Sequence, residues 1–398
     1  MVTVAVYWSR FGPYHIARLN HAARSLSALG VNVVGVEIAS DDDIYGWDVD
    51  DGPTAFERHV ALPGQVFERV SPVQMVRGVA ALLDRLDPDA VALNGYSYYD
   101  AWSALAWCKL HRRRAILMSD SHYADAPRST WKEWCKRRIV QRFDAALCAG
   151  KLQREYLQQL GMRPDTIHEG VDVVDNDYFW REAERARRNR DGCRSLPGLE
   201  HDGPFFLASA RFIKRKNLDT VLRAYAEYRR QLGKGAGKRA PWRLVVLGDG
   251  PERPALDRLV RAEGIEGVSF PGFVQIGQLP AYYGLAGAFV HAAEREQWGL
   301  VINEAMAAGL PVLVSSACGC APDLVANGEN GFTFPPRDIT ALASLMAQVS
   351  TGMVDLQAMA AASRARIAGW GLDRFSQGLY AALQSASQSH EQRTKGRR

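Results

Sequence analysis

The chain has 398 residues, which at a typical ~150 residues per domain predicts two or three domains, with two similar halves as the first interpretation. Hydrophobic residues make up 47% and charged residues 23%, so disordered, collagen-like and low-complexity classes are excluded. The 49 basic and 44 acidic residues leave a net charge of +5, far from the dense basic stripe of a nucleic-acid-binding protein, so no nucleic-acid partner is expected.

Cysteine usage and the N-terminus bear on location. The 6 cysteines are few and scattered, so they predict no disulfide framework and favour a reducing compartment. The N-terminal run has no basic region ahead of its apolar residues and is interpreted as a first strand rather than a signal peptide. No run of eighteen apolar residues occurs, so no membrane span is expected. These features predict a cytoplasmic protein that is either free or peripheral at the inner membrane face.

The first third of the chain alternates short β-branched runs with longer amphipathic stretches, which predicts strands and helices in turn. The expected strands cover residues 2–8, 31–38, 89–93, 115–119 and 145–148. The expected helices cover residues 14–29, 72–86 and 98–111. This repeated order of strand, helix and strand is typical of a parallel sheet with helices on both faces.

The alternation stops at a charged run, residues 181–190, and then restarts. The expected later strands cover residues 205–208, 243–247, 268–270, 288–291, 312–314 and 331–334. The predicted division is therefore an N-terminal Rossmann-like acceptor domain at 1–175, a linker at 176–203, a C-terminal Rossmann-like donor domain at 204–370 and a basic disordered tail at 389–398. A helix at 371–388 is expected to complete the first domain.

This pattern predicts an α/β fold of two facing Rossmann-like domains, each a doubly wound parallel sheet, with an interdomain cleft. Ligands of such sheets bind beyond the carboxyl ends of the strands. The functional site is therefore expected in the loops that follow strands.

One such loop concentrates positive charge. Arg211, Lys214, Arg215 and Lys216 follow an expected strand, and Asn217 is a good N-cap for the next helix. Cations beside a helix N-terminus can bind a diphosphate through charge and free backbone N–H groups. A solvated surface loop would have the same composition, so both interpretations remain open here.

A second post-strand loop carries a pair of carboxylates. Glu296 lies in the loop, and Glu304 follows after seven intervening residues, inside a helix expected to run from about Gly299 to Ala308 with Gly309 as its stop. Glu304 could there reach a ribose diol. If both were ordinary surface charges, Glu304 would be unexplained on an otherwise apolar helix.

These segments, taken together, resemble the signature of the retaining, nucleotide-sugar-dependent glycosyltransferases of family 4, the group 1 type, whose fold is the two-domain GT-B architecture. The resemblance is densest over residues 205–335 and looser in the N-terminal half. The motifs that carry it are, in chain order, Arg211 with Lys216, Leu247-Gly-Asp-Gly-Pro251, Pro271-Gly-Phe-Val274, Glu296 with Glu304, and Asn330-Gly-Phe332.

The resemblance implies roles for the nucleotide-binding residues. Arg211 and Lys216 would bind the donor diphosphate and stabilise it as the leaving group. Glu304 would bind the ribose hydroxyls, and the main chain at Phe273 and Val274 would meet the base. No cofactor and no metal would be needed, because the basic residues take the place of a metal.

It also implies how the donor sugar is held. Glu296 would bind the sugar hydroxyls, assisted by backbone N–H groups of Trp298, Gly299 and Leu300, and Gly248 would line the donor site. The family usually has Gly-Phe-Gly after the first glutamate, whereas this chain has Gln297-Trp-Gly299. The resemblance therefore does not specify the sugar.

Three N-terminal residues are further candidates. Gly12 follows the first expected strand and either lets the donor phosphates approach closely or is a plain turn glycine. Tyr14 and His15 follow it and are candidates for the acceptor side.

A histidine that touches the donor sugar is common in the family, and His122 is the candidate here, in the loop after the strand at 115–119. Asp120 or Ser121 could occupy the same place, with Asp120 also a candidate for the acceptor side. A surface histidine is the alternative.

Two motifs contain residue types that can bind metal ions. Asp41-Asp-Asp43 and Asp48-Val-Asp50 could belong to the metal-binding motif of the other glycosyltransferase architecture, but their surroundings favour an acceptor-side loop. Cys318-Gly-Cys320 lacks the second ligand pair of a zinc site.

A segment of aromatic and basic residues, 131–143, is expected to be helical. Its composition suits an anionic membrane surface and a lipid-linked acceptor. A helix that packs its tryptophans inward and leaves its cations in solvent is the alternative.

The predicted function is transfer of a hexose-type sugar, with retention, from a nucleotide-diphosphate sugar, with UDP as the preferred base, to a glycan or lipid-linked acceptor in cell-surface polysaccharide or glycolipid synthesis. A front-face reaction is the expected mechanism, since no carboxylate is marked for a double displacement. The alternatives are a non-catalytic nucleotide-sugar-binding subunit and a sugar-nucleotide epimerase or phosphorylase of the same architecture. A nicotinamide oxidoreductase is disfavoured because Ser9-Arg-Phe-Gly12 does not supply the Gly-x-Gly-x-x-Gly fingerprint.

Overall fold

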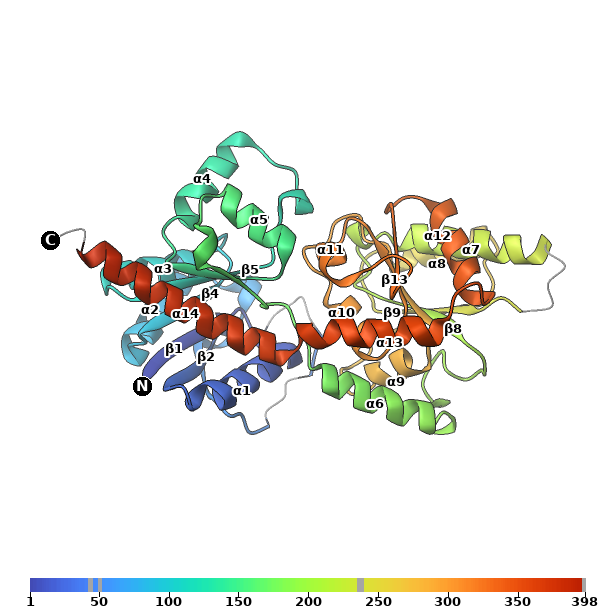
Figure 1. Cartoon of the computed structure of the whole chain (residues 1–398), viewed down its shortest axis with the longest axis horizontal. Coiled ribbons are helices and arrows are strands. Elements are labelled where there is room, and N and C mark those ends of the chain that lie inside the picture. Colours follow the sequence, from blue (N-terminus) through green and yellow to red (C-terminus); the bar gives the residue numbers. More distant parts are fainter. Residues whose placement is uncertain (42–45, 49–51, 235–239, 396–398) are drawn as a thin grey trace. The chain divides into compact units, whose positions relative to one another are not determined.

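The computed structural model describes residues 1–41, 46–48, 52–234 and 240–395 (Figure 1). The chain forms two compact units, the first from residues 1–175 and 370–398 and the second from residues 176–369. Each unit contains one parallel sheet with helices packed on it.

The first unit holds a seven-stranded sheet in the order β3-β2-β1-β4-β5-β6-β7, and all its pairings are parallel. The strands are β1 (Val2–Trp8), β2 (Val31–Asp41), β3 (Glu57–Val66), β4 (Ala90–Asn94), β5 (Arg114–Ser119), β6 (Ala145–Cys148) and β7 (Ile167–Glu169). Central strands such as β4 and β6 are apolar and buried on both faces, as expected for a sheet between two helical layers.

The helices of the first unit connect these strands, and the last of them comes from the C-terminal end of the chain. They are α1 (Pro13–Ser27), α2 (Pro72–Leu86), α3 (Tyr99–Leu110), α4 (Thr130–Val140), α5 (Lys151–Gln159) and α14 (Leu372–Lys395). Helix α14 packs against α1, β5, β6 and β7, as Figure 1 shows.

The second unit repeats the plan with a six-stranded sheet in the order β10-β9-β8-β11-β12-β13. Its strands are β8 (Phe205–Ser209), β9 (Arg243–Leu247), β10 (Val268–Gly272), β11 (Ala288–His291), β12 (Val312–Ser315) and β13 (Gly331–Phe334). Its helices are α6 (Asn176–Arg188), α7 (Leu218–Lys234), α8 (Arg253–Ala262), α9 (Leu279–Leu285), α10 (Leu300–Ala307), α11 (Ala321–Leu324), α12 (Ile339–Ser350) and α13 (Leu356–Ile367).

The prediction of two doubly wound, Rossmann-like parallel sheets is confirmed. In each sheet the strand order reverses next to the first strand of the unit, between β1 and β4 in the first and between β8 and β11 in the second. Loops that leave the carboxyl ends of two such strands diverge and leave room for a ligand. The loops after β1, β8 and β11 are therefore the places where the fold favours a site.

Two expected segments have a different structure. The expected linker at 176–203 contains helix α6, which belongs to the second unit. Its charges form ion pairs one turn apart, such as Arg187 with Glu184 at 2.8 Å, and Phe179, Ala183 and Ala186 are buried on its other face. The expected disordered tail also differs, since α14 stays helical as far as Lys395.

Candidate active site

The loop after β8 contains a short 3₁₀ helix at Lys214–Lys216, which ends at Asn217. Asn217 directly precedes α7, as expected, but its side chain does more than begin a helix. Its amide nitrogen donates to the carbonyl oxygens of Ala292, at 2.9 Å, and Pro336, at 2.5 Å. The loop that carries Lys216 is thereby tied to the loop after β11.

Backbone packing also fixes the first part of this loop. Gly248, directly after β9, has φ +119°, and a Cβ at this position would lie 1.9 Å from the carbonyl oxygen of Ala210. Only glycine allows the two loops to approach so closely. The structure thus gives Gly248 a packing role beside the cationic loop, and its predicted contact with the donor stays a prediction. Arg211, in the same loop, is exposed.

Glu296 is the centre of a buried ionic cluster in the loop after β11. The Lys216 ammonium pairs with Glu296 Oε2, and Nε2 of His291 lies 3.1 Å from the same oxygen. Glu296 is only 7% exposed. Lys216 and Glu296 are 80 positions apart in sequence, and the pairing of strands β8 and β11 brings them together.

The cluster has defined protonation states. Burial alone would raise the pKa of the Glu296 carboxyl, but the Lys216 ammonium and the hydrogen bond from His291 outweigh it and hold that pKa well below its usual range. Burial lowers the pKa of His291, more than its Glu296 partner raises it. His291 is therefore a neutral imidazole that donates its Nε2–H to an anionic carboxylate.

The backbone after Glu296 is shaped by a left-handed glycine and by the loop after β12. Gly299 has φ +108°, and a Cβ there would lie 2.8 Å from Ile302 Cδ1, so the turn into α10 requires glycine. The carbonyl of Trp298 accepts a hydrogen bond from the Cys320 N–H at 3.2 Å. The Trp298 indole is buried and donates to Asn303 Oδ1 at 3.0 Å. Trp298 therefore turns its ring into the protein, and its predicted main-chain contact with the donor stays a prediction.

Glu304 lies inside α10 and is 2% exposed. Its Oε2 accepts a hydrogen bond of 2.7 Å from the hydroxyl of Tyr283 in α9. Phe273 and Val274 follow β10, with the Phe273 side chain partly in solvent and Val274 buried. The second unit therefore carries predicted donor residues in the loops after β8, β9, β10 and β11, which leave the same edge of the sheet, and Glu304 in helix α10, which follows the last of these loops.

In the first unit, Gly12, Tyr14 and His15 form the turn from β1 into α1. The Gly12 N–H donates to His15 Nδ1 at 3.0 Å, and the His15 ring stacks on Trp8 with centroids 4.5 Å apart. A Cβ on Gly12 would meet its nearest neighbour, Trp47, at an ordinary 3.6 Å, so this turn does not require glycine for space. Tyr14 packs edge-on against Trp47 at 6.0 Å.

The pKa of His15 leads to a testable prediction. Burial and the nearby Arg18 guanidinium lower it to about 3, so the folded protein holds this imidazole neutral. Because the folded pKa is depressed, His15 contributes stability that is complete above its unfolded pKa of about 6.5 and is lost as the pH falls below that value. We expect the NMR signal of the His15 imidazole to show no protonation between pH 7 and pH 5. A titration midpoint near 6.5 would contradict this assignment.

His122 and Asp120 follow β5. His122 is 3% exposed, so the alternative of a surface histidine is wrong. Its N–H donates to Asp125 Oδ2 at 3.2 Å at the start of a 3₁₀ turn, Tyr123–Asp125. Asp120 is partly exposed and acts electrostatically on buried Arg18 of α1, as does Tyr14. The loops after β1 and β5 thus bring Tyr14 and Asp120 near one buried guanidinium.

Within the described ranges, no group of three or more His, Cys, Asp or Glu side chains could hold a metal ion. Of the two aspartate motifs, Asp42, Asp43 and Asp50 lie outside the described residues. Cys318 and Cys320 are buried free cysteines.

Helix α4 covers most of the aromatic and basic segment. Trp131 is 69% and Trp134 49% exposed, and their rings stack at 5.1 Å. The alternative in which these tryptophans pack inward is therefore wrong. Among the residues that the structure describes, no helix is both long and apolar enough to cross a bilayer.

Comparison with known proteins identifies the family. The model described as "Glycosyl transferases group 1" matches residues 194–366, and the model described as "Glycosyl transferase 4-like domain" matches residues 16–169. The chain belongs to the group 1 glycosyltransferases, as its motifs predicted.

Curated relatives match over part of the chain. The alpha-monoglucosyldiacylglycerol synthase of Acholeplasma laidlawii is 29% identical over 138 residues, which are 34% of this chain and 33% of that protein. A GDP-mannose-dependent alpha-(1-6)-phosphatidylinositol monomannoside mannosyltransferase of Mycobacterium tuberculosis is 30% identical over 203 residues, 48% of each. The chain therefore spans about half or less of the length of these relatives.

Solved structures match over nearly the whole chain. A sucrose-phosphate synthase from Thermosynechococcus elongatus has a TM-score of 0.73 at 19% identity, over 97% of this chain and 100% of that one. HepE of Anabaena in complex with UDP-glucose has a TM-score of 0.69 at 17% identity, with the same coverage. These likenesses show the fold, which is of the GT-B type.

The sequence did not indicate the contacts that three residues make in the second-unit site. His291 and Tyr283 hold the two glutamates, and Asn217 joins the two loops. The position of His291 at the end of a buried strand, five residues before Glu296, was the available signal. Tyr283 had none, because its contact crosses from one helix to another.

Proposed function

We propose that the protein is a retaining, metal-independent glycosyltransferase that moves a hexose-type sugar from a nucleotide-diphosphate sugar to a glycan or lipid-linked acceptor. The observation that carries this proposal is the buried cluster of Lys216, Glu296 and His291 beside the turn into α10. Family membership supports the class of reaction.

Lys216 and Arg211 are proposed to bind the diphosphate. Both belong to the loop after β8, at the point where the strand order reverses. As the bond from the sugar to the diphosphate breaks, negative charge accumulates on the leaving phosphate, and fixed cations stabilise that charge. This electrostatic role is the one a metal plays elsewhere, so no metal is required in the proposal.

Glu296 is proposed to accept hydrogen bonds from the sugar hydroxyls. Its depressed pKa keeps the carboxylate ionised, and an ionised carboxylate is an acceptor only, with up to four lone-pair sites. Lys216 and His291 meet Oε2. These two contacts therefore fix the carboxylate, in addition to the contact proposed between Lys216 and the diphosphate. With no second carboxylate assigned beneath the anomeric carbon, we propose a front-face reaction in which the departing phosphate takes the acceptor proton.

Glu304, Phe273 and Val274 are proposed to bind the nucleoside. Tyr283 donates a hydrogen bond to one oxygen of Glu304 and so restrains the carboxylate that is proposed to bind a ribose diol. We propose uridine as the base, supported by HepE, a protein of the same fold that was solved with UDP-glucose. A GDP donor is the other base to test, because the mycobacterial relative is GDP-mannose-dependent.

The acceptor is proposed to meet the first unit, at Tyr14, His15 and Asp120, with His122 touching the donor sugar. A lipid-linked acceptor is supported by the names of the two relatives, of which one is a monoglucosyldiacylglycerol synthase and the other a phosphatidylinositol monomannoside mannosyltransferase. The proposed setting is the synthesis of a glycolipid or cell-surface polysaccharide at the cytoplasmic face of a membrane.

Helix α4 is proposed to dock on an anionic membrane surface. Exposed Trp131 and Trp134 suit the interface between headgroups and acyl chains, and the cations around them complement anionic lipid headgroups. The exposed cations of this segment are Lys132, Arg137, Arg138 and Arg142.

Replacing both tryptophans with alanine is expected to weaken binding to vesicles that contain phosphatidylglycerol by about fivefold or more, because interfacial aromatic area is lost. Cosedimentation measures this, and Trp102→Ala is the control, since Trp102 is 45% exposed on a different helix, α3. Equal binding of the double variant and the wild type would contradict docking through α4.

The function itself is tested by a transfer assay. Purified protein is incubated with UDP-glucose, UDP-galactose or GDP-mannose and with diacylglycerol or phosphatidylinositol vesicles, and the glycolipid product is analysed by NMR for its anomeric configuration. The proposal predicts an α-linked product from an α-linked donor, in the presence of EDTA. An inverted product or a reaction abolished by EDTA would refute the corresponding part, and donor binding without transfer would favour the non-catalytic subunit.

A further inference from the structure

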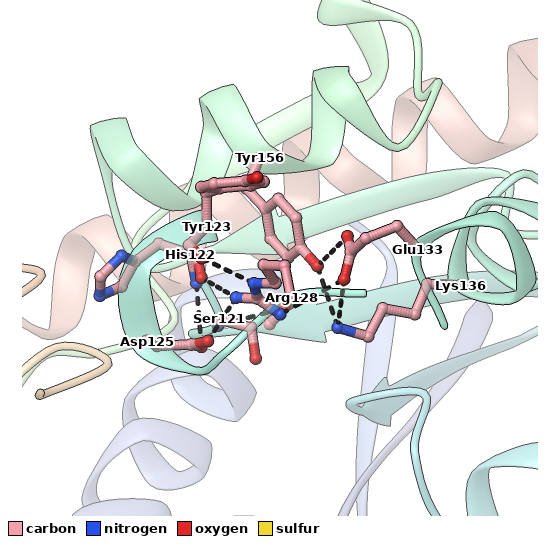
Figure 2. Close-up of polar contacts among 9 residues, drawn as sticks. Ser121, His122, Tyr123, Asp125, Arg128, Glu133, Lys136 and Tyr156 are labelled. Carbon is pink, nitrogen blue, oxygen red and sulfur yellow. Dashed lines mark hydrogen bonds and ion pairs between the residues drawn. The ribbon is translucent and has the colours of Figure 1, made fainter. Parts of the chain in front are cut away.

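The side chain of Arg128 binds the loop that carries His122 (Figure 2). The Arg128 Nε donates to the carbonyl oxygen of Tyr123 at 2.6 Å, and its Nη2 donates to the carbonyl oxygen of His122 and pairs with the carboxylate of Asp125. Asp125 in turn accepts the His122 N–H. Both peptide groups of His122 are therefore bound, one to the guanidinium and the other to its carboxylate partner.

Arg128 is itself fixed by helices α4 and α5. Its guanidinium carbon lies 4.5 Å from the centre of the Tyr156 ring, and its Nη1 lies 3.7 Å from Glu133 Oε1. The Tyr156 hydroxyl donates to Glu133 Oε2 at 2.7 Å, and Lys136 donates to Glu133 Oε1 at 2.9 Å. Arg128 is 10% exposed. A charge with this many partners at low exposure has one favoured geometry.

Glu133 and Tyr156, which contact Arg128, each keep one ionisation state near neutral pH. Burial alone would raise the pKa of Glu133, but its hydrogen bonds with Lys136 and Tyr156 outweigh it and lower that pKa. Burial and the hydrogen bond to Glu133 raise the pKa of Tyr156, so its hydroxyl stays protonated and donates. The support of Arg128 is therefore constant across the neutral pH range.

The geometry separates the two ends of His122. Figure 2 shows its imidazole directed away from Arg128, while its carbonyl faces the guanidinium. Between β5 and α4 the loop has only one short 3₁₀ turn, Tyr123–Asp125. Without a regular backbone ladder, the orientation of the ring depends on contacts that hold the main chain.

We propose that Arg128 is a positioning residue, which fixes the main chain of His122 so that the imidazole keeps one orientation toward the donor sugar. This inference rests on the proposed function, in which His122 touches that sugar. Lysine could not replace arginine fully, because one ammonium cannot present a planar fork to two carbonyl groups and a carboxylate at once.

Kinetics test the catalytic part. Arg128→Lys and Arg128→Gln are compared with His122→Ala and with the double variant Arg128→Gln/His122→Ala, and Arg163→Gln serves as an exposed control in the same unit. We expect Arg128→Gln to lower kcat by roughly 10- to 100-fold, as a displaced contact group does, with the donor KM changed by less than about threefold. Arg128→Lys should have a higher kcat than Arg128→Gln. The double variant should have a kcat less than about twofold below that of His122→Ala alone.

Hydrogen–deuterium exchange tests the structural part without requiring turnover. In Arg128→Gln and in the milder Arg128→Lys, we expect faster exchange in peptides covering 119–129 and unchanged exchange in peptides covering 292–299 of the second unit. Unchanged exchange at 119–129 in both variants would contradict the proposal that Arg128 holds the main chain of this loop. If the loss of kcat in the double variant equals the product of the losses in Arg128→Gln and His122→Ala, Arg128 does not act through His122. Faster exchange at 119–129 in the variants, together with no transfer by the wild type, would refute the proposed function. It would still support the structural role of Arg128 in holding this loop.

Discussion

Replacing Lys216 with alanine is expected to lower kcat/KM about a hundredfold or more, since removing one fixed group that stabilises developing charge costs roughly 10²–10³ in rate. Two effects combine. The diphosphate loses a cation, and the Glu296 carboxylate loses the ammonium paired with its Oε2, to which neutral His291 still donates. The pKa of Glu296 should therefore rise, because Lys216 is a main cause of its depression. Initial rates with the donor identified in the transfer assay measure the change in kcat/KM.

Lys214→Ala is the matched control for this substitution. Lys214 lies in the same 3₁₀ helix as Lys216, but its side chain is exposed. We expect less than about a threefold change, because an exposed charge in water contributes little. Equal losses from Lys214→Ala and Lys216→Ala would mean that the loop acts only through its net charge, and the specific role of Lys216 would then be wrong.

Replacing Glu296 with glutamine is expected to lower kcat by about a hundredfold while nucleoside diphosphate binding stays within about threefold of the wild type. The amide has the same shape, but it is a weaker acceptor and presents a donor to Lys216 or to the sugar. Because the proposed contact is with the sugar and not with the diphosphate, binding of the nucleotide alone should be spared. Single-turnover rates and calorimetry separate the two quantities.

Glu294→Gln controls for the loss of a loop carboxylate. Glu294 lies two residues before Glu296 and pairs with Arg337 at 2.7 Å on the surface. Near-normal activity is expected for this variant. Near-normal turnover of Glu296→Gln would argue against its sugar-holding role, and lost nucleotide binding would place Glu296 at the diphosphate instead.

Much of the fold could be predicted because hydrophobic periodicity determines a doubly wound sheet. The bounds of β1, β6, β9, β11 and β13 agree with the expected ranges. Strand β3 was missed because Pro63 and Gly64 interrupt it, and both are tolerated there since β3 is an edge strand. Helix α6 was missed for a different reason, since its charged face, read in one dimension, is indistinguishable from a solvated linker.

The site could be predicted residue by residue but not as an arrangement. Spacing identified Lys216 and Glu296 separately, and their contact depends on the pairing of β8 with β11 and on the Asn217 amide that joins the loops. Burial decided other questions, such as the exposure of Trp131 and the enclosure of His122. Arg128 carried no signal, because its role lies in hydrogen bonds to carbonyl groups, which any local sequence provides.

We propose above that Lys216, Glu296 and Glu304 form a donor site in the second unit. The most direct test of that site is the binding of nucleoside diphosphates. Wild type and Lys216→Ala are titrated with UDP, GDP and ADP in a calorimeter, in buffer with EDTA. We expect UDP to bind the wild type and to bind Lys216→Ala at least tenfold more weakly, about 1.4 kcal/mol, because the diphosphate loses a fixed cation. Equal affinity of the two proteins, or a folded wild type that binds no nucleoside diphosphate, would contradict the proposed donor site.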